Sequence, residues 1–269
     1  MIGWIPVPGA KALAPLASLA LLMSLLASGC ENPVAWRVSS LSRKDSLINY
    51  YRTPHFVFFF DTSVYSMPEV ISNGKAKEAH LQRINKELGV SFEKEIMVRL
   101  ISESGQNWSG QAYPREPYFI QETRDYFVED NGHEVVHIVS FETLGLPWLR
   151  FFVEGLAAAH ELDARPKYAR LCGIRADPEE LPGILERMIG ATISENVNYE
   201  LAAAYVEWLE VEFGLETFKS FYQELAGNPN YDWTKICIHH FGIHPEQLHE
   251  RFSSERFTMA RNSRYCAGN

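Results

Sequence analysis

The pentapeptide His133–His137, which reads His-Glu-Val-Val-His, constrains the fold of this chain more than any other segment. Its neighbours are apolar, so we expect a mostly buried helix over 133–141. Residues four apart on a helix lie on the same face, and the imidazoles of His133 and His137 must therefore share one side of a buried element. Buried polar side chains need polar partners. The fold has to bring other polar groups to this face of the helix.

A metal ion would satisfy both imidazoles at once. Glu134 can reach a water molecule held by such an ion, which is the arrangement of zinc hydrolases with the carboxylate as general base. The alternative interpretation is a core or surface helix that carries two histidines by accident. Sixteen residues separate His137 from Glu154, which is the single carboxylate in the nearly apolar segment Phe151–Ala159. An unpaired buried carboxylate is costly, so we take Glu154 as the third ligand.

Together these two segments resemble the gluzincin metallopeptidases, the clan that includes thermolysin and the aminopeptidase N-like enzymes. The resemblance is carried by His133–His137 and by Glu154–Ala157, which reads Glu-Gly-Leu-Ala, and it is greatest to the small "peptidase MA-like" members. It implies an α+β fold in which an N-terminal twisted β-sheet subdomain with the His-Glu-x-x-His helix is followed by an α-helical subdomain, with the metal site between them. It also implies one Zn²⁺ per chain, held by His133, His137 and Glu154, with Glu134 as general base.

A third segment, Tyr199–Leu209, is similar to the helix of the same clan that begins with a tyrosine. The resemblance implies that Tyr199 donates a hydrogen bond to the oxyanion of the tetrahedral intermediate. The alternative is an aromatic residue that packs in the core at a helix start, and Tyr205 is the second candidate for the donor. Endopeptidase and aminopeptidase activity both stay open. Tyr113–Glu122 is a candidate for the strand along which a substrate binds.

The hydrophobic pattern changes near residue 130. Before it, β-branched and aromatic runs predict strands with one helix at Ala76–Leu88, and after it helical periodicity prevails. This order is typical of an α+β protein. We expect a domain over 51–250, with a β-rich part at 51–130 and a helical part at 131–250, and a C-terminal tail at 251–269. The expected strands are His55–Phe60, Glu95–Ile101, Tyr113–Glu122 and Tyr126–Val128, and the later expected helices are His133–Phe141, Leu149–Leu162, Leu181–Ile189, Tyr199–Phe213, Glu216–Leu225 and Pro245–Phe252.

The N-terminal region predicts export. Residues 1–29 contain no Asp or Glu and one basic residue, Lys11, which precedes an apolar run typical of a secretory signal. The segment Ala27–Cys30 resembles a bacterial lipobox, which implies lipid attachment at Cys30 and a tether over residues 30–50. An ordinary cleaved signal and a retained anchor are the alternatives. All three interpretations place the rest of the chain outside the cytoplasm. Lipid attachment at Cys30 would also fix it to a membrane of the bacterial cell envelope, facing the periplasm or exterior.

Charge and cysteine content restrict the partners and the covalent links. The net charge is −9, and from residue 30 onward it is 24 − 34 = −10. A nucleic-acid partner needs a basic surface, so we expect none. Three cysteines of the folded part, Cys172, Cys237 and Cys266, allow one disulfide in an exported protein, and the sequence does not select the pairing.

Two further histidine segments are interpreted as structural. His160 and Glu161 are expected to be polar surface, or at most a contact behind the metal ligands. A later group of histidines is expected to consist of surface or core side chains rather than a second metal site, because Gly242 and Pro245 interrupt a helix there. The members of this group are His239, His240, His244 and His249.

The motifs therefore predict a monomeric, exported lipoprotein that hydrolyses peptide bonds of a peptide or protein substrate with a zinc ion. Two other functions stay open: a catalytically inactive gluzincin-fold binding protein, and a cell-envelope assembly factor in which the motif is accidental. An intact general base at Glu134 favours the enzyme, because a purely structural zinc site has no need of one.

Overall fold

The computed structural model describes residues 48–101, 110–113, 118–128, 130–162, 167–174, 176–190, 197–227, 232–261 and 266. These residues belong to one compact unit. The predicted signal at 1–29, the predicted lipid-attachment residue Cys30 and most of the predicted tether lie outside the described residues. Within the described ranges, no helix has both the length and the apolar composition needed to cross a membrane.

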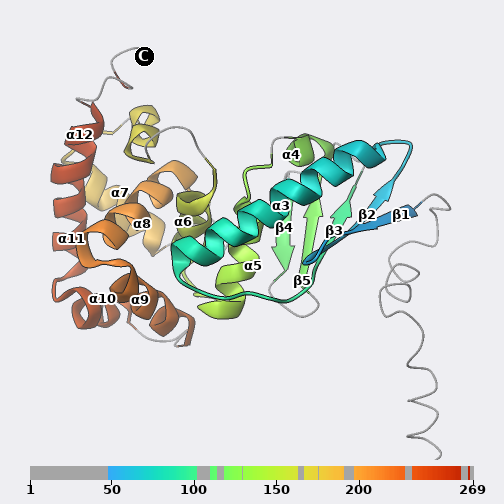
Figure 1. The fold of residues 1–269 in the computed structure, drawn as a ribbon. Coiled ribbons are helices and arrows are strands. Elements are labelled where there is room, and N and C mark those ends of the chain that lie inside the picture. Colours follow the sequence, from blue (N-terminus) through green and yellow to red (C-terminus); the bar gives the residue numbers. More distant parts are fainter. Residues whose placement is uncertain are drawn as a thin grey trace, which may run out of the picture. The chain divides into compact units, whose positions relative to one another are not determined.

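A five-stranded mixed sheet forms the first part of the fold, with the strand order β1-β2-β3-β5-β4 (Figure 1). The central strands β2, β3 and β5 run parallel, and β1 and β4 pair antiparallel at the two edges. Parallel strands are normally covered on both faces and are continuously apolar, which fits the buried run Phe56–Phe60 in β2. The strand bounds are Ile48–Arg52 (β1), Phe56–Asp61 (β2), Ile96–Leu100 (β3), Gly110–Tyr113 (β4) and Tyr118–Glu122 (β5).

Helix α3, Met67–Leu88, connects β2 to β3 and lies in front of the sheet in Figure 1. It begins well before the predicted start at Ala76. Ser66 and Glu69 form a capping box, and Pro68 lies in the first turn, so the polar segment before residue 76 has its own helix-start signal. The apolar periodicity alone does not reveal this first part of the helix.

A buried lysine links α3 to the sheet and to the segment that precedes α5. The Lys77 ammonium lies 2.5 Å from Oε1 of Glu122 at the end of β5, and 2.9 Å from Oδ2 of Asp130. Burial outweighs the attraction of Lys77 and raises the pKa of Glu122 to about 7. Lys77 thus holds Asp130 in place at the entrance to α5.

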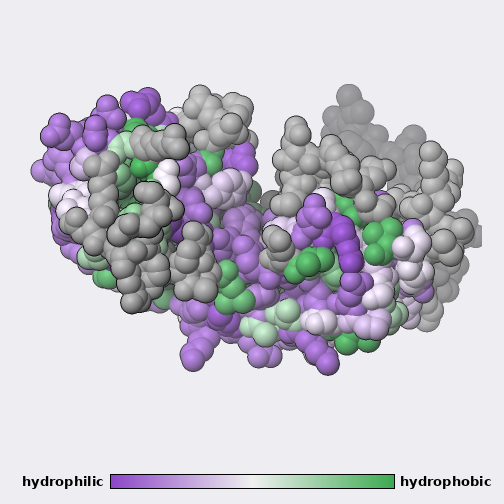
Figure 2. Space-filling view, turned by 90° about the horizontal axis from the view of Figure 1, so that it is seen from above, coloured by the Kyte–Doolittle hydropathy of each residue, from purple (hydrophilic) through white to green (hydrophobic). Residues whose placement is uncertain are grey.

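The second part of the fold is helical, and α6 and α8 pack closely against each other there. The face seen in Figure 2 is hollowed between this helical part and the sheet, and hydrophilic residues predominate among the coloured residues there. Helices outside the sheet region are α4 (Arg124–Val128), α5 (His133–Thr143), α6 (Arg150–His160), the 3₁₀ helix η2 (Lys167–Gly173), α7 (Leu181–Ile189), α8 (Tyr199–Phe213), α9 (Leu215–Gly227), α10 (Trp233–Phe241), α11 (Pro245–Phe252), the π-helix η3 (Ser253–Phe257) and α12 (Thr258–Arg261).

The described residues form an α+β fold, as the sequence predicts, and the observed bounds of α7, α8 and α11 are the predicted ones. One predicted strand is wrong, because Tyr126–Val128 forms the end of the short helix α4. The first strand also begins at Ile48, ahead of the predicted domain start at residue 51. Its residues are mixed in polarity because β1 is an edge strand, and they carry no continuous apolar run.

The described part of the C-terminal segment contains helices. Residues 251–261 are helical, through the end of α11, η3 and α12. Cys266 forms a disulfide with Cys172, which ties this end of the chain to η2, and Cys237 is a free, buried thiol. The sequence predicted a disulfide among these three cysteines without choosing between the pairings.

Candidate metal centre

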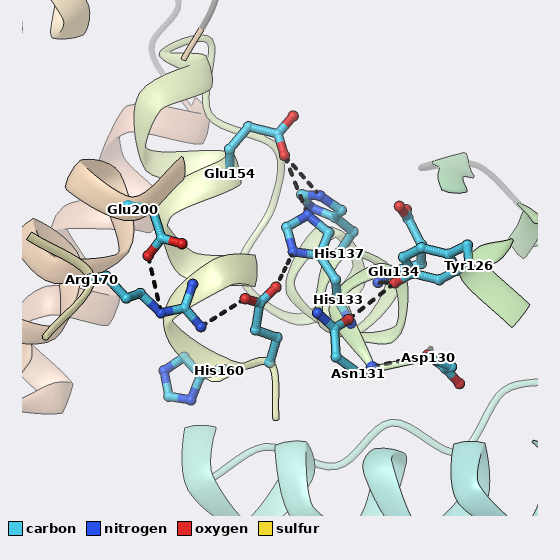
Figure 3. Close-up of polar contacts among 12 residues, drawn as sticks. Tyr126, Asp130, Asn131, His133, Glu134, His137, Glu154, His160, Arg170 and Glu200 are labelled. Atoms are coloured by element: carbon cyan, nitrogen blue, oxygen red, sulfur yellow. Dashed lines mark hydrogen bonds and ion pairs between the residues drawn. The ribbon is translucent and has the colours of Figure 1, made fainter. Parts of the chain in front are cut away.

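The start of α5 is fixed by two side chains that precede it. Asp130 Oδ1 accepts a hydrogen bond from the backbone N–H of Gly132 at 2.9 Å, and Asn131 Oδ1 accepts one from that of His133 at 3.1 Å. Gly132 has a φ of 83°, and a Cβ there would lie 2.9 Å from Cγ of His80, so glycine is the residue that fits. These contacts set the direction in which the first turn of α5 presents its histidine (Figure 3).

Three potential metal ligands meet between α5 and α6 (Figure 3). Nε2 of His133 lies 3.4 Å from Oε2 of Glu154, and Nε2 of His137 lies 3.3 Å from the same oxygen. One ligand atom from each residue lies within 4.8 Å of the others. The two imidazole rings are nearly perpendicular, with centroids 4.7 Å apart. The structure therefore brings together the three residues that the sequence singled out as ligands.

His133 is oriented from behind by a second carboxylate. Its Nδ1 lies 2.9 Å from Oε2 of Glu161, and Arg170 Nη2 donates to Oε1 of Glu161 at 2.7 Å. With a metal ion bound, a hydrogen bond from Nδ1–H to a carboxylate would leave the Nε2 lone pair, at the atom that faces Glu154, available to the ion. Metal-binding histidines are commonly held in this way, with one ring nitrogen on a carboxylate and the other on the ion.

The electrostatics of the site favour positive charge among the three side chains. Burial lowers the pKa of His133, but hydrogen bonds with Glu154 and Glu161 outweigh burial and raise it to about 9. Burial also opposes ionisation of Glu154, yet hydrogen bonds from His133 and His137 hold the pKa of this carboxyl well below its usual range. Two imidazole nitrogens and a carboxylate oxygen are donors that zinc prefers. The residues present therefore fit a bound Zn²⁺.

The glycine after Glu154 has a packing role. A Cβ on Gly155 would lie 2.8 Å from Cγ2 of Val206 and 2.9 Å from the backbone oxygen of Ala202, both on α8. The absence of a side chain thus lets α6 approach α8 and fixes where Glu154 stands. The carboxylate is also held from its own helix, because Arg150 Nε donates to Oε1 of Glu154 at 3.1 Å.

Glu134 points toward edge strand β4. A Cβ on Gly110 would lie 2.8 Å from Oε1 of Glu134, so the carboxylate packs directly on the backbone of this strand. Both residues line a cavity of about 780 Å³ that also contains the three candidate ligands. The cavity is lined by Gly110, Gln111, Ala112, Tyr126, Asn131, His133, Glu134, His137, Phe141, Arg150, Val153, Glu154, Glu161, Arg170, Tyr199 and Glu200.

The strand beside the cavity, β4, overlaps the segment that the sequence suggested at Tyr113. The candidate segment was Tyr113–Glu122, whereas the residues along the cavity are 110–112 of β4. The later part of that segment, Tyr118–Glu122, is β5, one position further into the sheet. The sequence Gly-Gln-Ala-Tyr of β4 has no apolar alternation, so its strand character arises from pairing with β5.

The two tyrosines proposed as oxyanion donors lie in different environments. Tyr199 lines the cavity and is 43% exposed, and its ring centroid lies 5.9 Å from that of His133. Its hydroxyl lies 3.5 Å from Nη2 of Arg150, and burial raises its pKa above the usual value. Tyr205 is 1% exposed and packs against Phe151 in the core. Of the two tyrosines, Tyr199 is the one that lines the cavity.

The segment His160-Glu161 is not polar surface. Glu161 contacts the candidate ligand His133 through Nδ1. This is the second predicted option, a contact behind the metal ligands. The ring of His160 is mostly buried, with Nδ1 3.1 Å from Glu87 Oε2 and Nε2 3.0 Å from Glu210 Oε1. The available signal was the spacing, because Glu161 follows Glu154 by seven residues, or about two helical turns, and so returns to the same side.

No protein-family model matches the chain, and no curated protein matches it.

Structure comparison finds M1 zinc metallopeptidases. A mutant from Deinococcus radiodurans bound to a Tyr-Ser-Ala substrate has a TM-score of 0.49 and 14% identity, covering 77% of this chain and 51% of that one. A two-domain M1 mutant bound to L-tryptophan has a TM-score of 0.50 and 14% identity, covering 78% and 52%. The fold resembles that of the second enzyme. The chain spans about half the length of these solved structures, so the similarity concerns the fold of the shared part.

Proposed function

We propose that this chain is a zinc-dependent peptidase of the gluzincin type. The observation that carries the proposal is the convergence of His133 and His137 on one oxygen of Glu154, in a cavity that Glu134 also lines. A cavity with convergent titratable groups on a metallopeptidase-like fold is the expected position of an active site. The fold similarity to M1 zinc metallopeptidases supports the same reaction class.

In this proposal His133, His137 and Glu154 hold one Zn²⁺. Zinc in such a site polarises a scissile carbonyl and lowers the pKa of a water molecule toward neutrality. Glu161 would keep the Nε2 lone pair of His133 available to such an ion, and Arg150 holds the other oxygen of Glu154. These contacts restrict the ligands to one arrangement before any substrate binds.

Proton transfer is assigned to Glu134. Its carboxylate takes a proton from the attacking water and later delivers it to the leaving amine, which is the task of a general base that becomes a general acid. Tyr199, which lines the same cavity, stabilises the oxyanion through its hydroxyl. Arg150, 3.5 Å from that hydroxyl, keeps it on the side of α6 that carries Glu154.

A peptide or protein substrate suits the shape of the site. Strand β4 is an edge of the sheet in the described part of the chain, and residues 110–112 line the cavity. The outer N–H and C=O groups of an edge strand can pair with an extended peptide. Such pairing would lay the peptide backbone beside Glu134, because this side chain contacts Gly110.

Digestion of a peptide library tests the proposal. Zinc-loaded wild-type protein is expected to cleave peptides, and Glu134→Gln to retain zinc while its cleavage rate falls by at least about 10²-fold. Glu142→Gln is the matched control, since it makes the same chemical change two turns later on α5, where Glu142 contacts Lys94 and Tyr118. Equal activity in wild type and Glu134→Gln would refute the mechanism. So would a zinc-loaded wild type that cleaves no member of the library.

We also propose that the chain acts as a monomer attached to the bacterial cell envelope through lipid at Cys30, facing the periplasm or exterior. The basis for the lipid anchor is the signal-like segment 1–29 and the lipobox-like segment Ala27–Cys30. Expression in a bacterium with a labelled fatty acid should label the wild type and leave Cys30→Ser unlabelled. Light scattering of the detergent-purified protein should give the mass of one chain. Label in both variants, or a mass of two chains, would contradict the respective part.

A further inference from the structure

The later group of histidines separates into three environments. His244 contacts Glu246, and the buried ring of His249 stacks on Trp233. His239 and His240 instead lie on the last turn of α10 and both approach one carboxylate of α9. Helices α9 and α10 are neighbours in the fold (Figure 1). This last pair of histidines is therefore the part of the group with a shared partner.

The shared partner is Glu224. Its Oε2 lies 3.0 Å from Nδ1 of His239 and 2.7 Å from Nε2 of His240. The two rings present different nitrogens to this oxygen, Nδ1 of His239 and Nε2 of His240. The ring centroids lie 4.6 Å apart. One ligand atom from each of the three residues lies within 4.8 Å of the others.

This geometry suits a metal ion as well as it suits hydrogen bonds. Ligands bound to one zinc at about 2.0–2.2 Å lie roughly 3–3.5 Å apart in a tetrahedron. The two separations from Glu224 Oε2 are 2.7 and 3.0 Å, so a shift of a few tenths of an ångström would bring these two into that range. The donor set, two imidazoles and one glutamate, has the same composition as the candidate centre at His133, His137 and Glu154.

The cluster is packed against the protein on the side of His240 and open to solvent on the side of His239. The side chain of His240 is 13% exposed and its ring packs edge-on against Phe221, which lies on α9 and fixes the ring. Glu224 is 26% exposed and His239 is 69% exposed, so the cluster opens to solvent on the side of His239. An ion could enter from solution there, with water completing its coordination.

We propose that Glu224, His239 and His240 form a second metal site, which binds a borderline divalent cation such as Zn²⁺, Ni²⁺ or Cu²⁺ and joins the last turn of α10 to α9. Imidazole ligands select these ions over Mg²⁺ and Ca²⁺, which prefer all-oxygen sites. The site is weaker than the candidate centre in the cavity, because its side chains are more exposed and His239 must be ordered on binding. The proposal does not depend on whether the chain hydrolyses peptides.

Titration of metal-free protein with Zn²⁺, followed by calorimetry, measures the number of sites. The double variant His239→Ala, His240→Ala is expected to bind one equivalent fewer than the wild type. His244→Ala is the matched control, since it removes an exposed histidine that has one carboxylate partner and no second imidazole, and it should bind as many equivalents as the wild type. Equal numbers in the wild type and the double variant would overturn the proposal, and so would a full equivalent of Mg²⁺ at the same site.

A further variant keeps the proposal testable if the double variant does not fold. Glu224→Gln keeps the shape of the side chain and removes its charge, and it should bind the weaker equivalent at least about tenfold less tightly. Because the ion joins two helices, excess Zn²⁺ should also raise the Tm of the wild type further than that of Glu224→Gln. Unchanged affinity for the weaker equivalent in Glu224→Gln would overturn the proposal.

Discussion

Nδ1 of His133 lies 2.9 Å from Oε2 of Glu161, at the point where α6 ends. Glu161 is the C-cap residue of that helix, and Arg170 holds its other oxygen at 2.7 Å. The candidate metal centre is thus supported from the end of the same helix that supplies Glu154. The orientation of one imidazole depends on where α6 stops.

Glu161→Gln is therefore expected to weaken zinc binding about 10–100-fold, since the carboxylate that orients His133 loses its charge. Competition with a chelator of known affinity measures this change. Glu87→Gln serves as the control, because Glu87 contacts His160 rather than His133. Identical zinc affinities in Glu161→Gln and the wild type would show that this contact does not support the site.

Gly110→Ala should impair catalysis without removing zinc. The new Cβ would lie 2.8 Å from Oε1 of Glu134, and the far end of a flexible side chain moves more easily than the paired strand. A displacement of about 1 Å at a catalytic group can reduce rates 10²-fold, so we expect kcat to fall about 10–100-fold with unchanged zinc content. A wild-type kcat in this variant would mean that Glu134 does not depend on its contact with β4.

Gly155→Ala tests the close packing of α6 on α8. Its Cβ would lie 2.9 Å from the backbone oxygen of Ala202, which cannot move away without shifting α8. Overpacking of this kind costs about 1–3 kcal/mol, measurable by urea unfolding. Gly183→Ala on α7 is the control, because the nearest atom to its Cβ would be 3.5 Å away and the new methyl group fits. This variant should be more stable than the wild type by about 0.5–1 kcal/mol, since alanine favours helix more than glycine does. A stable Gly155→Ala would contradict the assigned packing role.

His160 should make stability depend on pH. Burial lowers its pKa, but hydrogen bonds with Glu210 and Glu87 raise it to about 9. A raised pKa in the folded state stabilises the protein fully below the unfolded value near 6.5, and this contribution disappears as the pH rises through 9. The shift corresponds to about 3 kcal/mol. The difference in unfolding free energy between the wild type and His160→Gln should therefore be larger at pH 6 than at pH 9.5, and a pH-independent difference would contradict this assignment.

Much of the candidate site follows from local sequence. His133 and His137 share a helix face at any tertiary arrangement, and Glu154 stands out as one carboxylate in an apolar helix. The sequence left two options for Glu161, because its partner belongs to another helix and its position depends on the angle between α5 and α6. The sequence around Gly110 does not indicate its contact with Glu134, because this contact depends on the pairing of β4 with β5.

The fold shows the same division between local and distant information. Helices α7 and α8 carry their own start signals and periodicity, so their bounds could be predicted. Tyr126–Val128 has strand-like residues, but the segment is too short for intrinsic preference to prevail over packing, and it forms the end of α4. Helix α10 was not predicted, because Trp233–Phe241 mixes aromatic, β-branched and polar residues without a clear apolar stripe.

Zinc titration of the metal-free protein with peptidase activity as the readout tests the central claim most directly. We predict that activity is absent without metal, rises in proportion to added Zn²⁺ and stops rising at one equivalent per chain, because the centre at His133, His137 and Glu154 fills first. Filling of the weaker site should add no further activity. Hydrolysis that is independent of zinc, or no hydrolysis at any zinc level, would contradict the account.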